Sequence, residues 1–162
     1  MTKQDIFSIL DKNVAVGRTS LKIVAWVGVA FIAGGIAFLL FLTHDAIAVA
    51  SIFGGLGLLM ALIGFVSLAR NSVEKRADRI KHVLNYEPKD LIWAYVLRQN
   101  NRGAISISVV MNFRSGETYN ISDSAIPDKD TEGLLNALTL INPQMHLGYS
   151  EELQYKFKQK TL

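Results

Sequence analysis

Residues 23–42 read IVAWVGVAFIAGGIAFLLFL, twenty consecutive positions without a charged side chain. In an α-helix, at about 1.5 Å of rise per residue, this run is about 30 Å long, which matches the hydrocarbon thickness of a bilayer. The composition agrees with such a segment, because 50% of the 162 residues are hydrophobic and only 19% are charged. We therefore expect a transmembrane helix here.

A second uncharged run, residues 46–69, reads AIAVASIFGGLGLLMALIGFVSLA and is long enough to cross back with some tilt. The pair predicts a helical hairpin whose turn is formed by residues 43–45. The alternative is a secretory signal cleaved at Ala46-Ile47-Ala48. Signal cores have about 7 to 15 residues and begin nearer the N-terminus, so we favour the hairpin.

Basic side chains resist translocation, so their distribution predicts the orientation of the hairpin. Four of them precede the first run and five lie in residues 70–81, while the turn has neither Lys nor Arg. We expect a multi-pass protein of the inner (cytoplasmic) membrane with both termini in the cytoplasm. Residues 1–82 contain nine basic and five acidic side chains, against eight and nine in residues 83–162. The positive charge thus belongs to the membrane flanks and predicts no binding of duplex nucleic acid.

Small residues recur at steps of three and four along both runs, which places them on one face of each helix. Such a face lets helix backbones approach closely in lipid. It fits packing within the hairpin and also packing between copies in a homo-oligomer, since Gly28 and Gly35 add further small surface. The residues predicted to pack are Ala30, Gly34, Ala37, Ala50, Gly54, Gly57, Ala61 and Gly64.

The chain divides into four predicted segments: an N-terminal cytoplasmic or interfacial segment (1–22), the hairpin (23–69), a charged helical stalk (70–85) and a cytoplasmic α+β ligand-binding domain (86–162). We expect the stalk to continue from the second transmembrane helix and to transmit motion of the cytoplasmic domain; the alternative is that it only packs on that domain.

The N-terminal segment has an apolar face that we expect to lie on the membrane surface. Gly17 and Ser20 interrupt its pattern before the first span. The residues of this face are Ile6, Phe7, Ile9 and Leu10.

The cytoplasmic domain shows a β pattern followed by a helical one. Apolar positions alternate with polar ones over residues 105–113, and we expect further strands at 91–97 and 118–121. Asp128 or Asp130 then begins a helix with an apolar stripe, and a last short helix begins at Ser150. The predicted fold class is an α-helical transmembrane hairpin plus a small α+β domain, a three-stranded antiparallel meander with covering helices.

The sequence offers no catalytic motif, so we expect neither an enzyme nor a cofactor. No glycine precedes a lysine, as a phosphate-binding loop requires, and there is no cysteine. The three histidines are far apart and lack metal-ligand spacing. Asp128 and Asp130 resemble the start of a calcium loop, but its twelfth position is Thr139 where a bidentate glutamate is needed. Helix capping explains these acids better, and we expect no metal.

Polar and basic side chains gather at the predicted turns of the meander. Arginine binds phosphate with a planar fork, asparagine can read an adenine edge, and tyrosine or histidine can stack on a base. Each residue alone also fits a solvated turn. The predicted ligand surface comprises Arg98, Asn100, Asn101, Arg102, Arg114, Tyr119 and His146.

The layout of a two-helix membrane hairpin, no catalytic motif and a small C-terminal α+β domain resembles the small two-helix membrane effectors of type III CRISPR systems. The resemblance covers the whole chain and rests on architecture, not on a sequence motif. It implies antiphage defence, a cyclic tetra-adenylate ligand, a tetrameric assembly, and a ligand signal that perturbs the transmembrane helices and the membrane. The alternative is a non-catalytic membrane-tethered interaction module, similar to pleckstrin-homology domains, or an immunity protein against a membrane-acting toxin.

Overall fold

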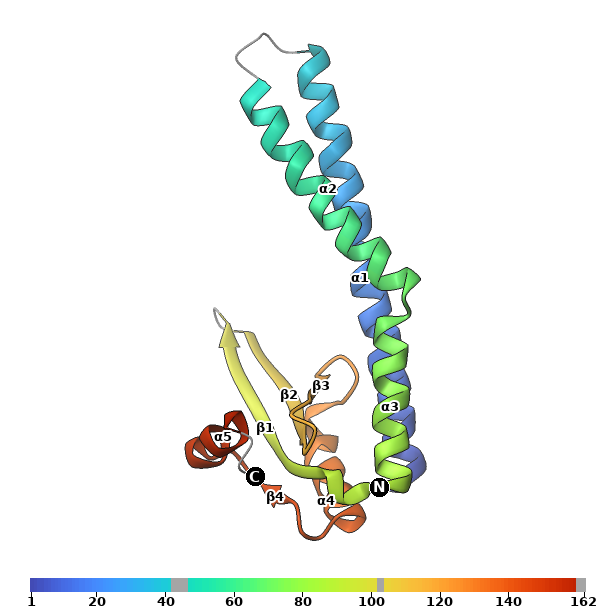
Figure 1. Ribbon diagram of the computed structural model, residues 1–162, viewed down its shortest axis with the longest axis vertical. Helices are drawn as coiled ribbons and strands as arrows, with labels where there is room; N and C mark the ends of the chain where they lie inside the picture. Colours follow the sequence, from blue (N-terminus) through green and yellow to red (C-terminus); the bar gives the residue numbers. More distant parts are fainter. Residues whose placement is uncertain (42–46, 102–103, 160–162) are drawn as a thin grey trace. The chain divides into compact units, whose positions relative to one another are not determined.

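The computed structural model describes residues 1–41, 47–101 and 104–159, without the side chains of residues 41, 47, 48, 101 and 104. The chain forms two compact units. The first, here called the sheet unit, combines Met1–Val14 with Ala77–Leu162, and the second, the hairpin unit, is Ala15–Arg76 (Figure 1). Each unit has its own packing.

The hairpin unit contains helix α1 (Lys3–Phe41) from Ala15 onward and helix α2 (Ile47–Ala69), and both helices are long and apolar enough to cross a membrane (Figure 1). The two predicted apolar helices are confirmed. The interruption expected at Gly17 and Ser20 is wrong, because α1 is continuous from its third residue. The Ser20 hydroxyl donates to the backbone O of Val16 (3.1 Å), which lets this polar side chain sit within a helix.

Helix α3 (Ser72–Tyr86) is separate from α2, so the stalk does not continue directly from the second apolar helix, and its Ile80 and Leu84 pack in the core of the sheet unit, as the alternative expected. Asn71 adopts a φ of 47°, in the left-handed region, and therefore cannot continue α2. The Ser72 hydroxyl donates to the backbone O of Ser67 (3.1 Å) at the junction. The apolar face expected on this helix is present, with Ala77, Ile80 and Leu84 buried.

The sheet has four strands: β1 (Leu91–Asn101), β2 (Ala104–Phe113), β3 (Thr118–Ser122) and β4 (His146–Leu147). Their order is β3-β2-β1-β4. The first three are the predicted antiparallel meander, and β4 adds a parallel edge next to β1, so the sheet is mixed and the three-stranded description is incomplete. A strand of two residues is too short to produce an alternating pattern, which is why the sequence did not predict it.

One face of the sheet carries the main core. The apolar side of the alternating β2 pattern points into it, and α4 (Thr131–Ile141), preceded by the 3-10 turn η3 (Asp128–Asp130), contributes Leu134 and Leu138. Asn142 ends α4, and its Nδ2 donates to the backbone O of Leu91 (2.7 Å). The helix predicted here therefore covers the sheet as expected.

The N-terminal turns of α1 complete this core, in contrast to the expected membrane-surface segment. Ile6 and Leu10 are 0% exposed and pack with Ile80 and Leu84 of α3. Lys81 and Asp11 form an ion pair between the same two helices. The apolar face of residues 1–14 thus belongs to the sheet unit, because it finds a protein surface to pack against.

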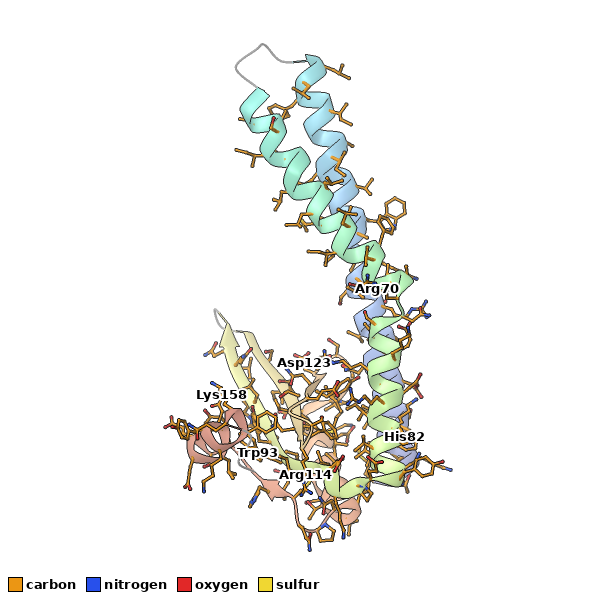
Figure 2. The ribbon with its side chains drawn as sticks, in the orientation of Figure 1. Arg70, His82, Trp93, Arg114, Asp123 and Lys158 are labelled. Atoms are coloured by element: carbon orange, nitrogen blue, oxygen red, sulfur yellow. The ribbon has the colours of Figure 1, made fainter. Side chains whose placement is uncertain are left out.

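Helix α5 (Glu151–Lys158) lies on the other face of the sheet. Its Leu153 and Phe157 pack on Trp93, Tyr95 and Val110, and Figure 2 shows Trp93 on β1 facing this helix. The predicted cap at Ser150 is confirmed, since its Oγ accepts from the backbone N–H of Leu153 (3.4 Å).

Candidate functional site

The residues predicted to form one ligand surface lie at two ends of the sheet. Arg98 and Asn100 are near the tip of the β1–β2 hairpin, where they pair with Ile107 and Ile105. Arg114 follows β2 at the opposite end, as Figure 2 shows. At about 3.3 Å per strand residue, the two ends are roughly 20 Å apart, so these side chains do not form a single cluster.

His146 lies at the Arg114 end, because it pairs with Trp93 at the beginning of β1. The side chain of Asn101 and all of Arg102 lie outside the described residues. The ligand-binding role of the residues at each end of the sheet stays a prediction.

Tyr119 does not fit the role of a stacking residue. Its side chain is 5% exposed and belongs to the main core. Its hydroxyl oxygen accepts a hydrogen bond from Asn13 Nδ2 (3.2 Å). The period of β3 explains this placement, since Tyr119 and Ile121 share the buried face of the strand.

Asn13 fastens α1 to the edge strand β3. Its Nδ2 also donates to the backbone O of Asn120 (3.1 Å), while its Oδ1 accepts from the backbone N–H (3.1 Å) and the hydroxyl (3.2 Å) of Ser122. An edge strand lacks a neighbour on one side, and the amide of Asn13 supplies partners for its backbone. No local pattern predicts this contact, because the partners are more than one hundred positions apart.

A groove of ≈ 590 Å³ opens in the sheet unit beside this contact, between α1 and the segment that leads into α4. The α1 wall contains Asp5, Ser8, Ile9 and Lys12, which recur at helical spacing along one side of the helix. The size is within the range of small-molecule sites, about 300–1,000 Å³. The opposite wall is formed by Ala125, Pro127, Lys129, Asp130 and Gly133, and Met1 also lines the groove.

One of the predicted ligand residues lies close to the segment that leads into α4. Arg98 lies 4.0 Å from the carboxylate of Asp128, the η3 residue between Pro127 and Lys129. The Arg98 side chain is 71% exposed, so this ion pair contributes little to stability. Neither Arg98 nor Asp128 lines the groove itself.

A cluster of aromatic rings lies on the α5 face. The centroids of Trp93 and Tyr95 are 4.6 Å apart, and those of Tyr95 and Tyr149 are 5.4 Å apart. The Trp93 indole N–H donates to the backbone O of Gly148 (2.6 Å). Burial, with a smaller effect of the nearby Tyr149, raises the pKa of Tyr95.

The hairpin helices touch through only part of the predicted small-residue face. A Cβ placed on Gly28 would lie 2.5 Å from the backbone N of Ala61, and one on Gly57 would lie 2.7 Å from the backbone O of Gly28. A Cβ on Gly64 would lie 2.8 Å from the backbone N of Ala25. The backbones are therefore in direct contact, as small residues allow.

The remaining small residues of α1 point elsewhere. Ala30, Gly34 and Ala37 are exposed, and a Cβ on Gly34 or Gly54 would meet no atom within 4 Å. Each residue turns a helix by about 100°, so Ala30 lies about 200° from Gly28 and cannot share its contact. Gly35 takes part instead, since its Cβ would lie 3.1 Å from the backbone O of Ala50.

No protein family model matches the chain, and no curated protein or solved structure matches it either.

Proposed function

We propose that this chain is a non-enzymatic membrane effector of antiphage defence, anchored in the inner membrane as a multi-pass protein with both termini in the cytoplasm. Its cytoplasmic part would bind a cyclic oligoadenylate, and binding would perturb the transmembrane helices and membrane integrity. The basic flanks of the two spans support the orientation, and the resemblance in layout supports the ligand.

The observation that carries this proposal is that one helix belongs to both units. Helix α1 supplies Lys3–Val14 to the core of the sheet unit and continues as the first apolar helix of the hairpin unit. Asn71 interrupts the other connection, between α2 and α3. A change in the packing of residues 3–14 would therefore reach the hairpin through an unbroken helix.

The hairpin is suited to respond to such a change. The two helices are in backbone contact at Gly28, Gly57 and Gly64. Helices packed this closely cannot shift past one another by small steps without steric clashes. The exposed Ala30 and Gly34 line an apolar hollow of ≈ 300 Å³ with three phenylalanines, which leaves a second face for association between copies. We propose a homo-oligomer, with a tetramer favoured because a four-fold ring presents one equivalent site to each unit of a cyclic tetranucleotide.

The full chain reconstituted in liposomes tests the function directly. Cyclic tetra-adenylate should raise the melting temperature, since a ligand at 100 times its Kd stabilises the folded state by about 2.7 kcal/mol. It should also release an entrapped dye, and linear tetra-adenylate serves as the matched control. Stabilisation without leakage would leave a binding module without effector activity. No stabilisation by any cyclic oligoadenylate would refute the effector function and favour the tethered interaction module.

A further inference from the structure

We propose that the groove between α1 and η3–α4 binds a phosphate-bearing nucleotide, with Lys12 and Lys129 contacting the phosphate from opposite walls. The ligand class rests on the proposed function, whereas the place of binding rests on the groove itself. For a cyclic tetra-adenylate shared by four copies, each groove takes one nucleotide unit.

The two lysines are available for a ligand. In the part of the chain that the structure describes, no ion pair joins Lys12 or Lys129 to a carboxylate, although Lys81, Arg79 and Lys156 all have acidic partners. Two ammonium groups on facing walls attract a group with several anionic oxygens, and a phosphate has them.

The carboxylates of the groove select against a simple anion. Asp5 already accepts from the backbone N–H (2.6 Å) and the hydroxyl (2.9 Å) of Thr2, which lowers its pKa and keeps it ionised. Asp130 lies at the N-cap position of α4 without a side-chain cap bond. A ligand that fits must therefore combine an anionic end with hydrogen-bond donors, and a nucleotide with an amino group on its base does so.

The walls of the groove are held in place by the core beneath them. Ile6 and Leu10 fix the α1 wall, and Ala125 and Ile126, each 2% exposed, fix the other. Asn13, next to Lys12, bonds to Ser122 at the end of β3, and the backbone O of Ser122 accepts from the backbone N–H of Ala125 (2.9 Å) in the other wall. The groove is thus preformed, and a ligand that bridges the lysines would act on the residues of α1 that continue into the hairpin.

Gly133 offers a way to block the groove without disturbing the fold. It is the third residue of α4, has an ordinary helical φ, and a Cβ placed on it would meet no atom within 4 Å. Gly133→Leu should therefore be accepted by the helix, where leucine is favoured over glycine, while its side chain enters the groove. Lys89→Ala, an exposed lysine on the 3-10 turn η2 (Pro88–Asp90) outside the groove, is the matched control for charge.

The test uses the full chain in detergent micelles with cyclic tetra-adenylate, ATP and inorganic phosphate as separate probes, and binding is followed by titration calorimetry. We expect Lys12→Ala and Lys129→Ala each to weaken nucleotide binding about tenfold, Gly133→Leu to abolish it, and Lys89→Ala to leave it unchanged. Melting temperatures of the variants, measured without ligand, identify any that fail to fold.

The outcomes separate the groove from the proposed function. If cyclic tetra-adenylate binds the wild type and all three groove variants equally, the groove assignment is overturned while the function stands. If ATP binds in the groove and cyclic tetra-adenylate does not, the groove assignment holds and the function fails. Equal affinity for inorganic phosphate and for nucleotides would overturn the assignment of a nucleotide as the ligand of the groove. No binding by any probe would overturn both the groove assignment and the proposed function.

Discussion

Replacing Asn13 by alanine tests whether α1 is fastened to the edge of the sheet. The change removes the hydrogen bonds to Tyr119, Asn120 and Ser122, of which all but the one to Asn120 are partly buried. Partly buried bonds contribute about 1 kcal/mol each, while the exposed one is replaced by water. Alanine recovers about 0.6 kcal/mol through its higher helix propensity. We therefore expect a net loss of about 2 kcal/mol.

The loss of stability should be visible in the melting temperature of the whole sheet unit and in the local hydrogen exchange of β3. In a sheet unit of this size, a loss of about 2 kcal/mol lowers the melting temperature by about 10 °C. Hydrogen–deuterium exchange in detergent should show faster exchange in β3, most of all at the backbone N–H of Ser122, whose acceptor is removed.

Two further variants make this test specific. Asn13→Asp keeps the acceptor for Ser122 and loses the donors to Tyr119 and Asn120, so its effect should be intermediate. Asn136→Ala replaces an exposed asparagine on α4 and should be neutral or slightly stabilising. If Asn13→Ala and Asn136→Ala have the same melting temperature and the same β3 exchange, the fastening role of Asn13 is refuted.

The other predictions concern the hairpin, α5 and alkaline pH. Gly57→Leu should destabilise the hairpin by about 1–3 kcal/mol because its Cβ meets backbone, whereas Gly54→Leu should be accepted; equal detergent stability of the two would contradict the observed contact face. Phe157→Ala should loosen α5 and increase acrylamide quenching of Trp93, measured with the other tryptophan replaced by phenylalanine; unchanged quenching would show that Phe157 does not hold the helix. Burial raises the pKa of Tyr95. The protonated Tyr95 side chain therefore contributes its full stabilisation below about pH 10, and this contribution is lost as the pH rises through the raised pKa of the folded state. Tyr95→Phe should therefore flatten the alkaline part of the stability profile, and an unchanged profile would exclude this residue as its cause.

Local patterns predicted most of the secondary structure. The uncharged runs correspond to α1 and α2, the alternation of residues 105–113 corresponds to β2, and the apolar stripe ended by Pro143 corresponds to α4. Each of these signals lies within one element and depends on a single period.

Contacts between distant segments could not be predicted in this way. The apolar face at Ile6 and Leu10 has the same pattern whether it meets lipid or a protein core, and only its partners in α3 and the sheet decide between them. Likewise, the spacing of small residues shows that a helix can pack closely, but not which face does so, and here the face is that of Gly28 and not of Ala30.

The distance between the predicted ligand residues could not be foreseen for the same reason. Arg98 and Arg114 stand out in the sequence because they are basic and lie near predicted turns, yet the register of β1 and β2 places them at opposite ends of the sheet. The groove is built from Lys12 and Lys129, which are separated by the whole hairpin and sheet in the sequence. Neither lysine belongs to a pattern that the sequence alone would distinguish.

The contribution of Ile6 and Leu10 to the core of the sheet unit affects the order of folding during synthesis and the choice of truncated fragments. During synthesis the first turns of the chain leave the ribosome long before α4, so the apolar runs can insert into a bilayer while the sheet still lacks its strands. A water-soluble fragment starting after the second run would lack these two side chains and leave an apolar opening in its core. Such a truncated product should aggregate unless a peptide of residues 1–14 is supplied in trans.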